Sequence, residues 1–140
     1  MHNIIIFVVL FSTGVLGNIP DWYPENPTEI EKQCMQQYPI SDEAKTEIRN
    51  FKLVDDPNMK PLLLCVANGQ NVYTSETDLD PERIAYSIYR SLHLECALEL
   101  VRECLGSHKE HSVNGNHEDF MYLSLECIFG GAPGKCTNVE

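Results

Sequence analysis

Apolar residues recur at intervals of three and four over most of this chain, which is the period of an amphipathic helix. The pattern is clearest from His93 to Leu105, HLECALELVRECL, where the apolar positions lie mostly opposite the acidic ones. Two of the six cysteines, Cys96 and Cys104, stand in this stretch. A helix would place them roughly 80° apart around its axis and about 12 Å apart along it. We therefore expect a central helix that is cross-linked at two points along its axis, and we expect the rest of the chain to fold around it.

Capping signals predict the other helices. Asparagine, serine or aspartate at a helix start can accept a hydrogen bond from a free backbone N–H group, and proline fits the first helical position. Such starts stand at Asn26–Pro27, Ser41, Asp56–Pro57 and Asp80–Pro81. A last helix is expected from about Glu118 to Phe129, before a glycine-rich stretch.

Breaks and polar segments separate these helices. A break is expected near Ser91–His93, because one helix from Pro81 to Leu105 would be unusually long. Gln70–Leu79 and the polar, histidine-containing segment after Gly106 are expected to be loops. Period-two alternation is nearly absent and no repeat is visible. The predicted fold class is therefore all-α, with six short helices linked by loops.

The first seventeen residues have the pattern of a secretory signal peptide. MHNIIIFVVLFSTGVLG contains an unbroken apolar run followed by small residues, which predicts cleavage after about Gly17. The run is too short to span a membrane as a helix. We expect residues 18–140 to form a single helical ligand-binding domain that is secreted, extracellular and without a membrane anchor.

The acidic composition limits the classes of molecule that this protein is expected to bind. The formal net charge is -11 at pH 7, which disfavours nucleic acid and anionic membranes as partners. No nucleophile elbow, H-E-x-x-H motif or phosphate-binding loop is present, so we expect no enzyme activity and no cofactor. The cysteine spacings do not match a metal or redox site, and we expect no metal.

The secretory route is oxidising, and six cysteines then predict three disulfides among fifteen possible pairings. If the central and last helices form an antiparallel hairpin, Cys104 lies near Cys127. Moving along both elements in the same spatial direction brings Cys96 level with Cys136, which leaves Cys34 for Cys65. The sequence does not determine the path of the glycine-rich tail that carries Cys136.

Four cysteines make the chain resemble the insect odorant-binding proteins, a family of small secreted six-helix proteins that includes the pheromone-binding proteins. Cys34, Cys65, Cys104 and Cys127 match the family's first, third, fourth and sixth cysteines, with thirty, thirty-eight and twenty-two residues between them. The resemblance covers the whole of residues 18–140. The family pairing implies the bonds Cys34–Cys65 and Cys104–Cys127.

The chain departs from the family pattern at two positions. Pro61 stands where the second cysteine is expected, four residues before Cys65, and Glu118 stands where the fifth is expected, nine residues before Cys127. Both members of one disulfide are thus absent together, as in the branch called minus-C. Cys96 and Cys136 are additions to that pattern.

The resemblance implies a function in transport and olfaction. A helical shell would enclose an apolar cavity and reversibly bind a small hydrophobic ligand, such as an odorant, a pheromone or a similar semiochemical. An olfactory or other cell-surface receptor would be a further partner. The candidate ligand-binding residues, for each of which core packing is the alternative role, are Met35, Phe51, Leu62, Val66, Ile84, Ile88, Leu92, Leu98, Val101, Met121, Tyr122 and Leu125.

Two further hypotheses concern polar side chains. Tyr89 and Tyr122 are candidates to hydrogen-bond a polar group of the ligand. Protonation of His93, His108, His111 and His117 between about pH 7 and 5 could release the ligand, with solvated loop histidines as the alternative.

A different functional class is also open. A secreted helical protein with a filled core could act on a receptor or partner protein as a seminal, salivary or signalling factor. Binding of an apolar probe inside the protein would distinguish the carrier from this alternative.

Overall fold

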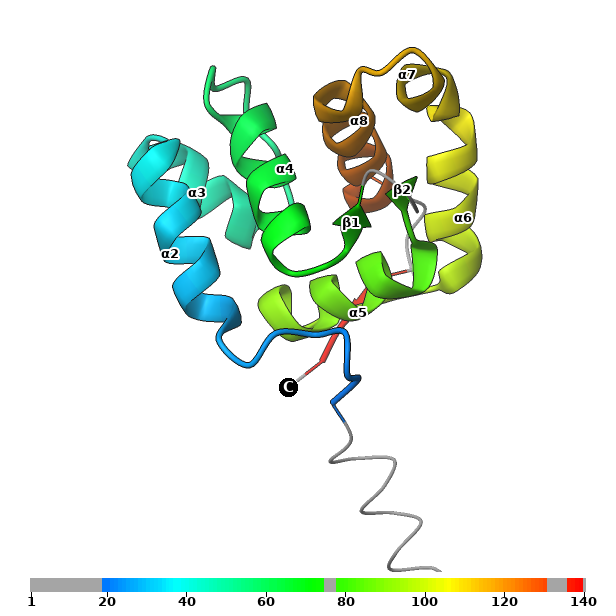
Figure 1. The fold of residues 1–140 in the computed structure, drawn as a ribbon, viewed down its shortest axis with the longest axis horizontal. Coiled ribbons are helices and arrows are strands. Elements are labelled where there is room, and N and C mark those ends of the chain that lie inside the picture. The colour runs from blue at the N-terminus through cyan, green and yellow to red at the C-terminus, as the bar shows by residue number, and fades with distance from the viewer. Residues whose placement is uncertain (1–18, 75–77, 131–135, 140) are drawn as a thin grey trace, which may run out of the picture.

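Short helices make up most of the structure, a computed structural model that describes residues 19–74, 78–130 and 136–139 (Figure 1). The helices are α2 Pro27–Gln37, α3 Asp42–Arg49, α4 Met59–Gly69, α5 Pro81–Leu92, α6 Leu98–Ser107, α7 Lys109–Val113 and α8 His117–Phe129. The strands are β1 Tyr73–Thr74, β2 Asp78–Leu79, β3 Leu94–Cys96 and β4 Cys136–Asn138. The predicted all-α class is confirmed, because each strand has only two or three residues.

The helices form two groups joined at α4 and α8. Figure 1 shows α2 and α3 beside α4 on one side, α6 and α7 with α8 on the other, and α5 running across below both groups. The helix α4 packs against both α2 and α8, while α8 also packs against α6. The core follows this division, with one buried cluster under α2, α3 and α4 and a larger one among α5, α6 and α8.

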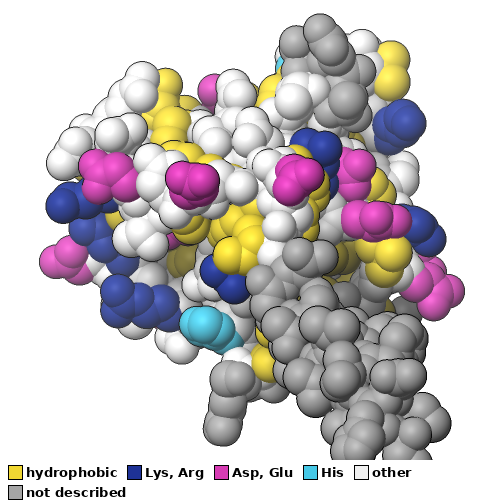
Figure 2. Space-filling model, turned by 60° about the horizontal axis from the view of Figure 1, so that its bottom comes forward, with side chains coloured by type: hydrophobic (Ala, Val, Ile, Leu, Met, Phe, Trp, Pro, Cys, Tyr) yellow, Lys and Arg dark blue, Asp and Glu magenta, His cyan; other side chains and the backbone are white. Residues whose placement is uncertain are grey.

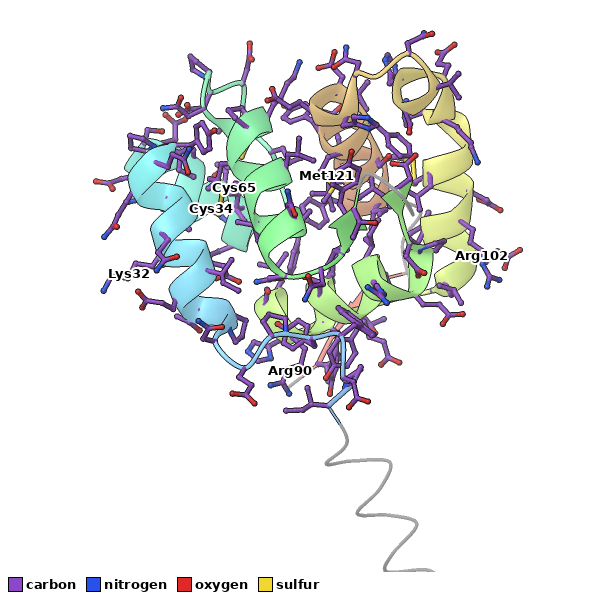
Figure 3. The ribbon with its side chains drawn as sticks, in the orientation of Figure 1. Lys32, Cys34, Cys65, Arg90, Arg102 and Met121 are labelled. Atoms are coloured by element: carbon purple, nitrogen blue, oxygen red, sulfur yellow. A yellow bond between two sulfur atoms is a disulfide. The ribbon has the colours of Figure 1, made fainter. Side chains whose placement is uncertain are left out.

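Three disulfides hold these elements together. Cys34–Cys65 joins α2 to α4 with the Cα atoms 5.9 Å apart, and Cys104–Cys127 joins α6 to α8 at 5.6 Å. Figure 3 shows the first of these bonds between its two helices. Cys96–Cys136 joins β3 to β4 with the Cα atoms 4.0 Å apart.

The central helix predicted from His93 to Leu105 is wrong in its first part. The chain breaks where expected, because His93 adopts a left-handed conformation with φ 54° and ends α5. Leu94–Cys96 then pairs antiparallel with Cys136–Asn138, and α6 begins only at Leu98. In β3 the residues alternate buried, exposed, buried, but three residues are too few for that period to outweigh the helical one.

Cys96 therefore reaches Cys136 by strand pairing. The two cysteines stand directly opposite each other in the β3–β4 ladder. The sequence pattern predicted that Cys96 lies on a helix, at the same height along it as Cys136 in the tail. The structure forms the same bond from a different local conformation.

Some of the predicted helix starts are confirmed by the structure and one is wrong. The Ser41 hydroxyl accepts a hydrogen bond from the Ala44 N–H at 3.1 Å, and Asp80 accepts from the N–H groups of Glu82 and Arg83, so both predictions are confirmed. Pro27 begins α2 as predicted, although the preceding asparagine makes no side-chain cap bond.

Asp56 was wrongly predicted as a cap, since α4 begins at Met59. Its carboxylate instead accepts from the backbone N–H of Asn58 at 3.0 Å and from that of Ser41 at 3.2 Å. Asp56 thus ties the turn before α4 to the start of α3. Aspartate forms such local turns as readily as caps, and the sequence does not separate the two.

The two segments predicted as loops contain short regular elements. Gln70–Leu79 includes the antiparallel pair β1–β2, and the polar segment after Gly106 includes α7. Both elements are shorter than the pattern length that sequence periodicity resolves. The last helix, predicted from about Glu118, begins one residue earlier at His117.

Charged side chains of both signs surround small hydrophobic areas on the face shown in Figure 2. Within the described residues, no helix is both long and apolar enough to cross a bilayer. The expected signal peptide, residues 1–17, lies outside the described residues.

The close approach of α2 to α4 at Gly69 yields a stability prediction. A Cβ at Gly69 would lie 2.5 Å from Cγ2 of Ile30, whereas a Cβ at Gly106 would meet nothing within 4 Å. We expect Gly69→Ala to lower the free energy of unfolding by about 1–3 kcal/mol through overpacking. Gly106→Ala, the matched control, should leave it unchanged or raise it by up to about 1 kcal/mol. Urea unfolding of the two variants measures the difference, and equal stabilities would contradict the close contact.

Candidate functional site

The structure contains a cavity of about 390 Å³ between α2, α3, α4, α5 and α8. This volume lies within the range of about 300–1,000 Å³ that is usual for small-molecule sites. Its lining residues are Glu31, Met35, Ile40, Lys45, Ile48, Arg49, Leu53, Leu62, Leu63, Val66, Ala67, Val72, Ile84, Ser87, Ile88, Ser91, Leu92, Met121, Leu125 and Phe129.

The interior of the cavity is apolar. Leu62 of α4, Ile84 and Ile88 of α5, and Met121 and Leu125 of α8 line it and are buried. These residues recur at helical spacing on their own elements, so each helix turns one apolar side toward the same space. Such a wall favours a hydrophobic molecule, because binding removes apolar surface from water on both sides.

One part of the cavity reaches the protein surface. Lys45, Arg49 and Ser91 line the cavity and are themselves exposed, and Glu31 beside them in the lining is half-buried. The cavity therefore combines an apolar interior with a polar mouth. A ligand with one polar end would fit this distribution.

A chain of hydrogen bonds crosses the polar wall from α5 to α4 and α2. Ser87 Oγ donates to Gln70 Oε1 at 2.8 Å, and Gln70 Nε2 donates to Glu31 Oε1 at 3.1 Å. Ser91 Oγ donates to the same Glu31 oxygen at 3.0 Å. Gln70 is 0% exposed, so its amide depends on these partners.

Tyr23 lies next to this polar wall. Burial raises the pKa of its phenol above the ordinary value, while the charge of Arg90 and a hydrogen bond with Ser91 partly offset that effect. Tyr23 therefore stays neutral at physiological pH. Its ring packs edge-to-face against Trp22 and Tyr86, which fixes the segment before α2 on α5.

The structure places eight of the predicted ligand-binding residues in the cavity lining. They are Met35, Leu62, Val66, Ile84, Ile88, Leu92, Met121 and Leu125. All eight lie on α2, α4, α5 or α8. Their placement shows a shared cavity, and whether they bind a ligand stays a prediction.

The other four predicted residues lie away from the cavity. Leu98 and Val101 belong to α6, which packs against α8 and contributes no lining residue. Phe51 packs against the cavity-lining Phe129, with ring centroids 6.2 Å apart, and is not itself in the lining. Tyr122 follows Met121 on α8 and so points about 100° away from it around the helix.

The two tyrosines expected to hold a polar group of the ligand do not line the cavity. Tyr89 is 41% exposed on the outer side of α5. The Tyr122 ring lies under Lys60, whose Nζ is 5.5 Å from its centroid. The polar groups in the lining are instead Glu31, Ser87 and Ser91, together with the two cations of α3.

Sequence reasoning missed these polar residues and the α3 contribution for a physical reason. Glu31, Ser87 and Lys45 occupy positions on amphipathic helices where polar residues normally face water. Nothing in a single helix shows that such a position borders a cavity formed by several helices. A useful signal would have been the spacing of Ser87 and Ser91, which lie four residues apart between the apolar positions of α5.

Within the described residues, no histidine lines the cavity. His117 Nδ1 lies 3.9 Å from Asp78 Oδ1, and the Ser112 hydroxyl donates to the same carboxylate. Both groups thus contact the Asp78 carboxylate, whereas in a nucleophilic triad the hydroxyl is hydrogen-bonded to the imidazole. No group of three potential metal ligands comes together in the described residues.

Comparison with known proteins gives one result. The model of the PBP/GOBP family matches residues 22–130, which is most of the chain. No curated protein and no solved structure gives a significant match.

An ion pair stands beside the two positions where the family resemblance expects a further disulfide. Lys60 of α4 lies 2.6 Å from Asp119 of α8, and their chain neighbours are Pro61 and Glu118. The hydrogen bond from Lys60 holds the pKa of Asp119 below its ordinary value and raises the pKa of Lys60 in turn. A charge-assisted contact thus joins two cavity-lining helices at this point.

This ion pair predicts a pH-dependent contribution to stability. Because the pKa of folded Asp119 is lowered, the contribution is present above the ordinary carboxyl value of 3.8 and is lost as the pH falls through the lowered pKa. We expect Lys60→Met to lower the melting temperature slightly at pH 7 and not at about pH 2.

Lys32→Met is the matched control, because Lys32 points outward from α2 (Figure 3). Thermal unfolding of both variants at the two pH values tests the pair. An effect of Lys60→Met that is the same at both pH values would show that lost packing or the lost contact with the Tyr122 ring, rather than the ion pair, explains it.

Proposed function

The chain belongs to the PBP/GOBP family, the insect odorant-binding proteins, and on this basis we propose that it is a secreted carrier of one small hydrophobic molecule. The ligand would be an odorant, a pheromone or a similar semiochemical, bound reversibly in the cavity between α2, α3, α4, α5 and α8. The family is one of binding proteins, and the proposed function involves no chemical step.

The apolar cavity is the observation that carries this proposal. A volume of about 390 Å³ in so small a chain means that much apolar surface is left without protein neighbours. An unfilled volume costs stability, so a protein that needed only a solid core would gain by closing it. A ligand that fills the cavity would recover the missing contacts and stabilise the fold.

The rest of the chain fits a carrier outside the cell. Three disulfides need an oxidising compartment, and the chain begins with a pattern typical of a secretory signal peptide. The formal net charge of -11 favours solubility at high concentration. A protein acting on a receptor through its surface would need these features too, but it would not need the cavity.

The test is displacement of N-phenyl-1-naphthylamine, a fluorescent apolar probe, from the oxidised protein lacking residues 1–17. We expect saturable one-to-one binding, displacement by apolar volatiles and a higher melting temperature with ligand, since binding stabilises only the folded state. A folded, disulfide-bonded protein that binds no probe would contradict the proposal and favour the receptor-acting alternative.

A pair of valine variants shows where the probe binds. Val66→Phe adds an aromatic ring inside the lining and should weaken binding by about tenfold or more, equivalent to about 1.4 kcal/mol. Val113→Phe adds the same ring at a residue that is 76% exposed, and it should have no effect. Equal affinities of the two variants would place the probe outside the cavity.

A further inference from the structure

We propose that the thioether of Met35, in the wall of the cavity, is a modification site that peroxides oxidise to the sulfoxide while the cavity is empty. The inference rests on the proposed function and concerns how the same cavity loses its affinity for apolar ligands. It follows from the exposure of the methionines, from their places in the fold and from the chemistry of the other lining residues.

Three methionines follow the expected signal peptide, and they differ in their contact with solvent. Met59 is 0% exposed and Met121 is 5% exposed, whereas Met35 is half-buried. Oxidation of a thioether needs direct contact between its sulfur and the oxidant, so susceptibility follows exposure. Hydrogen peroxide is little larger than water, and water-accessible surface therefore indicates where it reaches. Of the three, Met35 is the methionine that the fold leaves open to attack.

The position of Met35 makes its exposure depend on the cavity. Met35 follows Glu31 by four residues, which places both on the same face of α2 one helical turn apart. Both line the cavity, and Glu31 belongs to the polar lining near the protein surface. Peroxide that enters through the mouth thus meets Met35 one turn farther along α2. A molecule that occupies the cavity covers the same surface and excludes peroxide from it.

The other two methionines serve as internal comparisons. Met121 lines the cavity from α8, where core side chains cover it almost completely. Met59 stands at the start of α4, is buried in the cluster under α2, α3 and α4, and does not line the cavity. One methionine is therefore in the lining and open, one is in the lining and covered, and one is buried outside the lining.

The oxidation is balanced by the peroxide alone. The sulfur attacks one peroxide oxygen, the O–O bond breaks and an S–O bond forms. The other oxygen leaves as water from hydrogen peroxide, or as an alcohol from an organic hydroperoxide. The sulfur is oxidised and the peroxide is reduced, so no further reactant is needed. The product is methionine sulfoxide.

The sulfoxide changes this part of the wall from apolar to polar. An unoxidised methionine packs well against varied apolar ligands, because its side chain is flexible and polarisable. A sulfoxide oxygen accepts hydrogen bonds, and covering it with an apolar ligand costs free energy unless a donor replaces the lost water. The donors Lys45 and Arg49 are exposed in the same lining. A sulfoxide that turned toward them would leave the apolar wall, so the ligand loses contacts in either orientation.

The first experiment follows the oxidation of each methionine by peptide mapping with mass spectrometry. The disulfide-bonded protein lacking residues 1–17 is treated with hydrogen peroxide, with and without saturating N-phenyl-1-naphthylamine. We expect Met35 to react about fivefold or more faster than Met59 and Met121, because it is the most exposed of the three. The bound probe should slow the oxidation of Met35 by about threefold or more, because it covers the sulfur.

Two controls identify the cause of these differences. In concentrated urea the three methionines should react at nearly equal rates, since the fold no longer covers any of them. Free methionine in the same mixture should react equally fast with and without the probe, which excludes consumption of peroxide by the probe.

A pair of leucine variants tests the effect of oxidation on binding. Leucine conserves most of the volume of methionine and has no sulfur to oxidise. After peroxide treatment, the probe affinity of the unsubstituted protein should fall by about threefold or more, as for one imperfectly satisfied polar group in the wall. Met35→Leu should keep the affinity that it had before treatment. Met59→Leu is the matched control at a buried position outside the lining, and it should lose affinity as the unsubstituted protein does.

Failure of this inference and failure of the carrier function give different results. Oxidation of Met35 no faster than that of Met59, or equal rates with and without bound probe, would overturn the modification site while probe binding upheld the carrier function. An unchanged affinity of the peroxide-treated unsubstituted protein, or a loss of affinity in treated Met35→Leu, would overturn it too. Absence of probe binding in the folded, untreated protein would overturn both.

Discussion

The structure depends on keeping the walls of an apolar cavity apart. The cavity of about 390 Å³ leaves apolar side chains without protein neighbours, which costs stability until a ligand fills the space. Three disulfides with sequence separations of 31, 40 and 23 residues contribute about 11 kcal/mol together in the chain-entropy model. The cross-links therefore stabilise a fold that leaves part of its interior unfilled.

The placement of the cross-links explains how they act. Cys65 on α4 bonds to α2, a neighbouring wall of the cavity, and Cys127 on α8 bonds outward to α6. The helix α8 is thus held from behind by α6, while α4 is fixed to the adjacent wall α2. A further wall, α5, is held from outside by aromatic contacts, because Trp22 and Tyr23 pack on Tyr86 and Arg83 lies 4.9 Å above the Trp22 ring. All three helices can then present an apolar side to an unfilled space.

The cross-linking pattern differs from the family pattern between α4 and α8. Where the resemblance expects a disulfide between the α4 and α8 positions Pro61 and Glu118, the adjacent Lys60–Asp119 ion pair joins the same helices. An exposed ion pair contributes far less than a disulfide. The bond between Cys96 and Cys136 instead fixes the tail beside the junction of α5 and α6. The third disulfide thus lies at the β3–β4 pair, and the α4–α8 contact is left to packing and charge.

Local chemistry let the sequence alone determine most of the helices. Ser41 and Asp80 cap helices because they act on N–H groups two or three residues away, and the apolar period of α5 and α8 needs no tertiary contact to be recognised. Only the tertiary structure decided that Cys96 lies in a strand, since β3 forms by pairing with a segment 40 residues away. It also decided which apolar faces meet an unfilled space. Leu98 and Val101 have the same pattern as Ile84 and Ile88, yet they lie on a helix that packs behind α8, and Glu31 borders the cavity from a position that normally faces water. The periodicity of a helix predicts the direction in which each of its side chains points. Whether that side chain borders a cavity depends on how all the surrounding helices pack.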